Sequence, residues 1–181
     1  MRTLNTDLRW DESQPLDFSE IKRILDSRGG QAKGLRCGYV DLESVHGNYD
    51  LPRFLPAAHN CVAILLTTRI TGPVQRHWVS ICRNPKGVFF FDSLNLGYAM
   101  LSKILDDSGK FVAFLKKIRA KSNTRKLQSS HKMIRTCGLW TAVRIWCWKM
   151  TNPEFHHYIT NAPSCLRPDQ TVGLMTLIGH I

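Results

Sequence analysis

The apolar positions of the chain follow a helical period near its start. Between residues 16 and 27 they recur at the spacing of one helix face. Asp17 stands where an N-cap is expected, and Glu20 follows three residues later, as in a capping box. We therefore expect an amphipathic helix over residues 16–27, ended by Gly29 and Gly30. Its apolar face consists of Phe18, Ile21, Ile24 and Leu25.

The pattern changes to that of strands in the next part of the chain. Pro52 and Pro56 discourage regular structure, so turns and one short irregular strand are expected over residues 37–56. Residues 61–68 form a continuous β-branched and aliphatic run, which is typical of a strand buried on both faces of a sheet. A Thr-Gly-Pro turn follows at residues 71–73.

A hairpin comes next, and it carries two polar residues of chemical interest. Residues 77–82 alternate between two faces, as the residues of a strand do. The Asn-Pro-Lys-Gly sequence of residues 84–87 predicts a turn, after which residues 88–91 return as the partner strand. His77 begins the first strand and Asp92 ends the second. The hairpin should therefore bring these two side chains together.

The second half of the chain is mostly helical in pattern. Apolar residues recur at helical spacing over residues 96–105 and 111–118, and a polar, basic connector follows over residues 121–126. Residues 136–150 are almost uniformly apolar, and Thr136 is suited to cap a helix that begins there. A helix that is apolar on most sides belongs in the middle of a domain.

A short helix beginning at Asn152 and an apolar tail over residues 169–181 complete the pattern. The order of elements predicts an α+β fold with one domain, residues 1–181, in which residues 1–15 are expected to be flexible. We expect a small mixed or antiparallel central sheet. It should pack against the buried helix of residues 136–150.

The composition agrees with a globular protein. Apolar residues make up 43% of the 181 residues and charged residues 22%, and this length allows a core without staples. The polar start of the chain lacks the apolar segment of a secretory signal, and no run approaches the roughly 18 apolar residues that a membrane span requires. The sequence thus predicts a protein that is not secreted and has no membrane partner.

The six cysteines are spread widely, without the spacing of zinc ligands. We therefore expect a reducing compartment, mostly buried thiols and no metal. The cysteines are Cys37, Cys61, Cys82, Cys137, Cys147 and Cys165.

The formal charge of +11 is concentrated in one part of the sequence. Residues 108–153 contain eleven basic residues and no Asp or Glu. Such a segment favours a polyanion or an acidic partner, and a solvated face kept for solubility explains it equally well. The candidate nucleic-acid-binding residues are Lys116, Lys117, Arg119, Lys121, Arg125 and Lys126.

Cys137 stands where a nucleophile would be activated. A thiol reacts as thiolate, and a helix N-terminus and nearby cations lower its pKa. Cys137 begins the apolar helix, inside the basic segment. Gly138 would leave space for a substrate backbone and let backbone N–H groups point at an oxyanion. Gln128 is the nearest upstream side-chain amide, and it is a second candidate oxyanion donor.

His77 and Asp92 are the candidate base and orienting acid for this nucleophile. Each also has a structural interpretation. A single histidine at a strand start often serves the fold, and an aspartate that ends a strand before a serine often caps a turn. The ordered set of His77, Asp92, Gln128 and Cys137, each on the expected element, favours catalysis.

These motifs resemble a family of cysteine proteases that includes the adenovirus protease and the SUMO-deconjugating enzymes. The resemblance covers about residues 18–150 and lies in the ordered set rather than in any single motif. The short N-terminal helix and the chain length are similar to the adenovirus side of the group. The matching segments are Cys37-Gly38-Tyr39, His77-Trp78-Val79, Phe89-Phe90-Phe91-Asp92-Ser93, Gln128 and Cys137-Gly138-Leu139-Trp140.

The resemblance implies a role for each matching residue. His77 would be the general base, Asp92 the orienting acid, Cys137 the nucleophile and Gln128 the oxyanion donor. Trp78 would line the substrate groove. Asp92 stands where adenovirus enzymes have Glu, whereas related deconjugating proteases have Asp.

The spacing of Gln128 departs from the family pattern. Gln128 precedes Cys137 by nine residues, a few more than is usual in the family. Ser129 and His131 therefore remain alternatives as the group nearest the oxyanion.

The resemblance also implies a substrate class and partners. Such enzymes cleave after small residues, often Gly-Gly, and similar genes occur in DNA viruses and virus-like transposons. A monomer that matures viral precursor or structural proteins in the virion and in the host nucleus or cytoplasm is therefore expected. No cofactor is required for the chemistry, and DNA and a disulfide-bonded peptide are candidate activators. For the peptide, Cys82 and Cys165 both remain open.

Two other functions remain open from the sequence. The first is a deconjugase that cuts ubiquitin-like proteins after their terminal Gly-Gly. The second is a non-catalytic, basic nucleic-acid-binding module whose Cys and His serve the fold.

Overall fold

The computed structural model describes residues 15–27, 34–68, 74–131, 135–161 and 166–178. It has an α+β fold built on a mixed five-stranded sheet in the order β1-β2-β3-β4-β5. The two outer pairs of strands are parallel and the two inner pairs antiparallel. The strands are β1 (Cys37–Asp41), β2 (Cys61–Thr68), β3 (Gln75–Asn84), β4 (Gly87–Phe91) and β5 (Lys121–Ser122).

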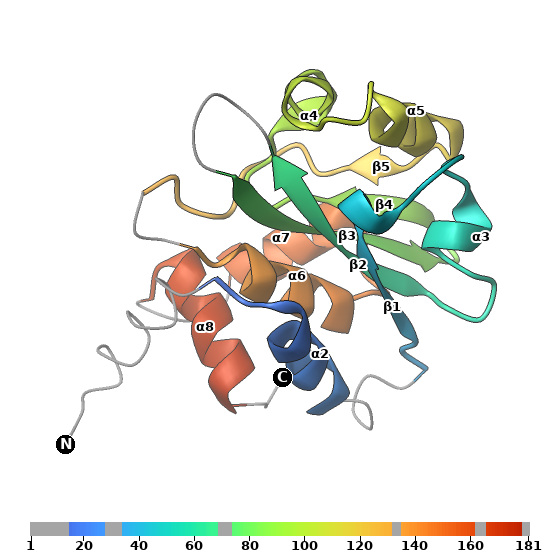
Figure 1. Cartoon of the computed structure of the whole chain (residues 1–181). Coiled ribbons are helices and arrows are strands. Elements are labelled where there is room, and N and C mark those ends of the chain that lie inside the picture. Colours follow the sequence, from blue (N-terminus) through green and yellow to red (C-terminus); the bar gives the residue numbers. More distant parts are fainter. Residues whose placement is uncertain (1–14, 28–33, 69–73, 132–134, 162–165, 179–181) are drawn as a thin grey trace.

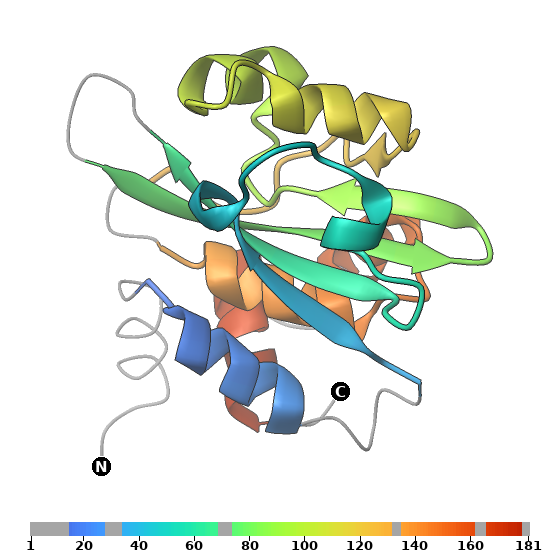
Figure 2. The same ribbon diagram turned by 45° about the vertical axis from the view of Figure 1, so that its right-hand side comes forward.

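Helices cover both faces of the sheet, which gives three layers (Figure 1). One layer contains α2 (Phe18–Ser27), α6 (Cys137–Trp146), α7 (Asn152–Thr160) and α8 (Pro168–Ile178). The opposite layer contains α3 (Leu51–Phe54), α4 (Gly97–Ile104) and α5 (Lys110–Lys117), with the 3₁₀ helix η1 (Leu42–Ser44). Figure 2 shows the sheet between these two layers.

Strand β2 is covered by helices on both faces of the sheet, which explains its continuous apolar sequence. Cys61, Ala63 and Leu65 pack in the layer of α6, while the alternate residues pack against α4 and α5. All eight residues of β2 are buried, and each large aliphatic side chain contributes roughly 1.5–3 kcal/mol by burial. The strand matches residues 61–68 as predicted.

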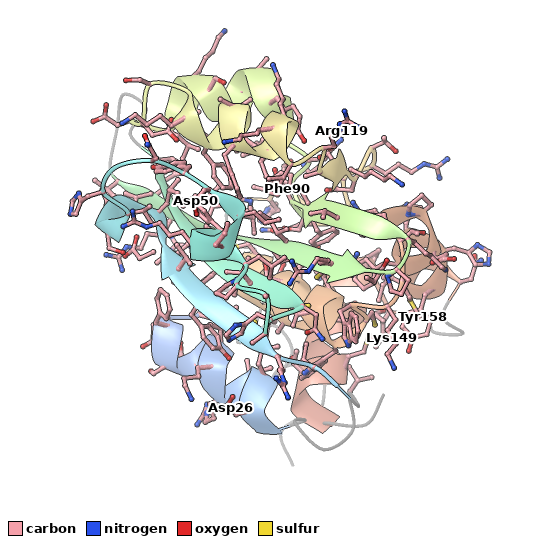
Figure 3. All side chains as sticks on the ribbon, turned by 90° about the vertical axis from the view of Figure 1, so that its right-hand side faces the viewer. Asp26, Asp50, Phe90, Arg119, Lys149 and Tyr158 are labelled. Atoms are coloured by element: carbon pink, nitrogen blue, oxygen red, sulfur yellow. The ribbon has the colours of Figure 1, made fainter. Side chains whose placement is uncertain are left out.

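The two strands of the hairpin, β3 and β4, also place alternate side chains in the two layers. Trp78 packs toward α6, whereas Val79 packs toward the opposite layer. Figure 3 shows Phe90 of β4 directed into the protein, while the labelled Arg119 and Lys149 lie at the surface. The predicted hairpin turn is confirmed, because Asn84 pairs with Gly87 across it.

The helix α6 is the centre of its layer, and all ten of its residues are buried. It ends at Trp146, so the predicted extension to residue 150 was wrong. Arg144 lies inside the protein near this end and donates hydrogen bonds to the carbonyl oxygens of Cys147 and Met150. These carbonyls face the guanidinium group instead of continuing the helix.

Three further expectations need correction. The segment 37–56 is more regular than predicted, because Asp50 caps the short helix α3 and Pro52 sits in its first turn, where proline is tolerated. The connector at residues 121–126 contains β5, which pairs with β4. Thr136 precedes α6 but makes no side-chain cap.

The first helix has the predicted capping box. The carboxylate of Asp17 accepts a hydrogen bond from the backbone N–H of Glu20, and that of Glu20 accepts one from the backbone N–H of Asp17. Among the described residues, no helix is long and apolar enough to cross a membrane. Predictions for residues 1–14, for the glycine stop at residues 29–30 and for the turn at residues 71–73 concern parts outside the described residues.

Candidate active site

The hairpin of β3 and β4 brings His77 and Asp92 together. Ser80 pairs with Phe91 in the register of the two strands, so Asp92 leaves the sheet beside the start of β3. The Nε2 atom of His77 lies 2.7 Å from Oδ1 of Asp92. The exposed fractions of His77 and Asp92 are 6% and 1%. The predicted contact is therefore present, and it is shielded from water.

Asp92 is also the cap of the turn that follows it. Its Oδ1 accepts a hydrogen bond from the backbone N–H of Leu94, and its Oδ2 accepts one from that of Leu96. Asn123 holds its backbone from β5's side, accepting from the N–H of Asp92 and donating to its carbonyl. The carboxylate thus has a fixed position before it meets His77. Both interpretations of Asp92, turn cap and histidine partner, apply to the same side chain.

Cys137 lies on the other side of His77. It is the first residue of α6 and is 7% exposed. Hydrogen bonding between its thiol and the imidazole of His77 shifts the pKa of both groups. Since Nε2 of His77 faces Asp92, the ring presents Nδ1 to the sulfur. The backbones of Trp78 and Gly138 also lower the pKa of Cys137.

These contacts shift the pKa of each of the three groups. Burial alone would lower the pKa of His77, but the hydrogen bonds with Asp92 and Cys137 outweigh it and raise that pKa to about 10. Burial alone would raise the pKa of Cys137, and the hydrogen bond and charge of His77 reverse this and lower it. The pKa of Asp92 is lowered against its burial by His77. The contacts therefore shift Cys137 toward thiolate and His77 toward imidazolium.

Gln128 is held beside the Asp92 end of the site. Its side chain is 5% exposed, and its Oε1 accepts a hydrogen bond of 2.7 Å from the hydroxyl of Ser93. Its backbone N–H donates to the carbonyl of Ser93. Because Ser93 engages the amide oxygen, the amide NH₂ is turned away from it.

The two predicted substrate-binding residues are both covered by Leu16. Trp78 is 2% exposed, and its indole N–H donates to the carbonyl of Leu16 at 2.8 Å. A Cβ atom at position 138 would lie 2.9 Å from Cβ of Leu16. The sequence predicted that the space beside Gly138 would admit a substrate backbone. In this structure the Leu16 side chain occupies that space.

Asp169 is a buried polar residue of this region that the sequence pattern did not single out. It lies in the first turn of α8 and is 2% exposed. Its Oδ2 accepts a hydrogen bond from the backbone N–H of Ser129, and its Oδ1 accepts one from the hydroxyl of Thr136. Oδ1 also accepts from the indole N–H of Trp140. Its position before the apolar tail gave no signal, since an acidic residue in a first helical turn is ordinary.

The candidate nucleic-acid-binding residues do not surround Cys137. They are all exposed, and those on α5, Lys116 and Lys117, stand on the face of the sheet opposite α6 (Figure 2). Lys121 lies 5.6 Å from the ring centre of Phe89. Arg125 lines a surface cavity of about 360 Å³ that neither Cys137 nor His77 borders. The positive residues therefore lie on α5, on β5 and in the segments that adjoin them.

Other predicted chemistry falls as follows. Cys82 is buried with its sulfur 3.4 Å from that of Cys61, so it is not open to an external peptide, and Cys165 lies outside the described residues. In the part of the chain that the structure describes, no three His, Cys, Asp or Glu side chains are grouped to hold a metal ion.

Comparison with models of protein families and with curated proteins found no match to this sequence.

Proposed function

We propose that the chain is a cysteine endopeptidase in which Cys137 is the nucleophile, His77 the general acid–base group and Asp92 the residue that orients it. The observation that carries the proposal is that the buried His77 interacts with both Cys137 and Asp92. The pKa of Cys137 supports it through its cause, because His77 lowers it, whereas the pKa of the buried Cys82 is lowered by Cys61 and Arg144. At Cys37, by contrast, burial raises the pKa of the thiol.

The chemistry proceeds in two balanced halves. The Cys137 thiolate attacks the substrate carbonyl carbon, and the oxyanion formed accepts hydrogen bonds from backbone N–H groups at the start of α6 and from the Gln128 amide. The His77 imidazolium gives its proton to the departing amine, which leaves a thioester on Cys137. Water then loses a proton to neutral His77 as it attacks the thioester. The acid is released and the thiolate–imidazolium pair returns.

The substrate class follows from the resemblance. We infer cleavage after small residues of the Gly-Gly type in precursor or structural proteins of a virus or virus-like transposon. The low exposure of Cys137 and His77 supports small residues at the cleavage site, because bulky side chains would be hindered there. A ubiquitin-like protein ending in Gly-Gly has the same chemistry at its scissile bond.

The decisive experiment is labelling with a peptide probe that ends in Gly-Gly and carries a thiol-reactive group. Modification of Cys137 is expected, with none in Cys137→Ala and slow modification in His77→Ala. Cys147→Ala is the matched control, because Cys147 ends the same helix and should not affect labelling. Labelling that persists in Cys137→Ala contradicts the proposal. A panel of viral-type peptides and ubiquitin-like reporters then separates endopeptidase from deconjugase.

DNA is a second partner that the charge supports. The net charge of +11 and the exposed cations on α5 and after β5 would bind phosphates through salt-sensitive contacts. The affinity for duplex DNA should fall steeply between about 50 and 200 mM salt if several phosphates are neutralised. A flat response would leave these cations as solvated surface.

Slow, non-selective alkylation of Cys137 by iodoacetamide at pH 6 would favour a binding module without catalysis.

A further inference from the structure

The two ends of the connector between Gln128 and Cys137 meet on one carboxyl group. Ser129, which follows Gln128, donates its backbone N–H to Oδ2 of Asp169 at 2.9 Å. Thr136, which precedes Cys137, donates its hydroxyl to Oδ1 of the same group at 2.6 Å. The connector has eight residues between Gln128 and Cys137, and its two ends are held by a single side chain from α8.

Gln128 is therefore held from two sides. On one side, Ser93 donates to its amide oxygen and accepts from its backbone N–H. On the other side, Asp169 binds the next backbone N–H. Trp140, one turn into α6, donates its indole N–H to Asp169 at 2.8 Å, which fixes the carboxyl group relative to the helix that carries Cys137.

We propose that Asp169 is a positioning residue, which sets the side-chain amide of Gln128 against the sulfur of Cys137. This inference rests on the proposed cysteine-protease function. In this chain, a carboxyl group 32 residues beyond Cys137 compensates for the long connector. Asp169 is not placed in contact with substrate, and it acts through the backbone of Ser129 and the hydroxyl of Thr136.

The substitution Asp169→Asn separates the two ends of the connector. One oxygen remains to accept from Thr136 and Trp140, and the new NH₂ then faces the N–H of Ser129, donor against donor. The α6 end should stay anchored while the Gln128 end is released. Loss of a whole oxyanion donor costs about 10²–10³ in kcat, so we expect a loss of about ten- to a hundredfold, with KM within about twofold.

A double-mutant cycle with Gln128→Ala tests the inference. If Asp169 works by placing Gln128, Asp169→Asn should cause less than about a twofold further loss of kcat in the Gln128→Ala background. The rate of Cys137 alkylation by iodoacetamide should stay within about twofold of wild type, because alkylation forms no oxyanion. Additive losses, or alkylation that falls in parallel with kcat, would overturn the inference.

Two further variants keep the test sharp. Trp140→Phe removes one hydrogen bond to Asp169 and leaves those of Ser129 and Thr136, so kcat should change far less than in Asp169→Asn. If Asp169→Asn does not fold, Thr136→Val takes its place in the double-mutant cycle with Gln128→Ala. Losses of kcat that add up in the double mutant again overturn the inference. A wild-type protein that neither cleaves peptides nor labels at Cys137 refutes the proposed function itself. Labelling of Cys137 with an additive cycle refutes only the role of Asp169.

Discussion

Replacement of Asp92 by Asn is the sharpest test of the site. In the protein, Asp92 accepts hydrogen bonds from Nε2 of His77 and from the N–H groups of Leu94 and Leu96. An amide has one acceptor oxygen, so it cannot satisfy all three donors. If its NH₂ turns to His77, Nε2 becomes an acceptor and the proton of neutral imidazole moves to Nδ1, beside Cys137. The ring then cannot take a proton there.

The expected magnitude follows from the pKa of His77. Raising this pKa from 6.5 to about 10 corresponds to a preference of roughly 5 kcal/mol for imidazolium, shared between Asp92 and Cys137. The Asp→Asn change in a serine-protease triad costs about 10⁴ in kcat. Here the hydrogen bond with Cys137 also raises the pKa of His77, so we expect a smaller loss of about 10–10² in kcat/KM.

The assay is the pH profile of kcat/KM for a Gly-Gly peptide between pH 5 and 10.5. His77 must be protonated to donate to the amine, so wild-type activity should fall as pH rises through about 10. In Asp92→Asn this alkaline limb should move to lower pH. Asp107→Asn is the matched control, because Asp107 likewise accepts from the second and fourth N–H groups after it, before α5. An unchanged alkaline limb and rate in Asp92→Asn would refute the assignment.

The remaining predictions concern stability. Gly138→Ala should lower the free energy of unfolding, measured in urea, by about 1–2 kcal/mol, because overpacking against Leu16 exceeds the gain in helix propensity. A more stable variant would show that the Leu16 side chain moves aside without cost. Arg144→Met removes one of the donors to the carbonyls of Cys147 and Met150 and should cost roughly 1–3 kcal/mol, because the Cys147 carbonyl still accepts from the backbone N–H of Met150. Exposed Lys149→Met should change stability by less than about 0.5 kcal/mol. The pKa of Asp92 is lowered from 3.8, so its ionised form stabilises the fold above about pH 4. That contribution is lost as pH falls through the lowered pKa, and acid titration of wild type against Asp92→Asn should show the stability gap closing.

The contact between His77 and Asp92 was predictable because a short turn fixes the register of a hairpin. Once residues 84–87 are read as the turn, His77 and Asp92 must lie at the same end of the two strands. The start of α6 at Cys137 was predictable for a similar local reason, since an apolar run after a polar connector marks a helix boundary. These features depend on neighbours within about fifteen residues.

Contacts between distant segments could not be predicted in this way. Leu16 lies against Gly138, and no period or turn in the sequence links them. Asp169 joins Ser129 and Thr136 through hydrogen bonds that depend on how α8 docks on α6. The spatial distribution of the basic segment was unpredictable for the same reason, because charge counted along the chain does not show that α5 and α6 lie on opposite faces of the sheet.

The burial of the site constrains which substrates the proposed chemistry can serve. The exposed fractions of Cys137, His77 and Asp92 are 7%, 6% and 1%, and Leu16 covers Trp78 and Gly138 beside them. A substrate carbonyl must reach a sulfur of low exposure, so under the proposed function bulky side chains at the cleavage site should carry a steric cost. Glycine at the cleavage site has no side chain and bends freely, so it meets that constraint best. The proposed preference for Gly-Gly is therefore compatible with the low exposure of Cys137.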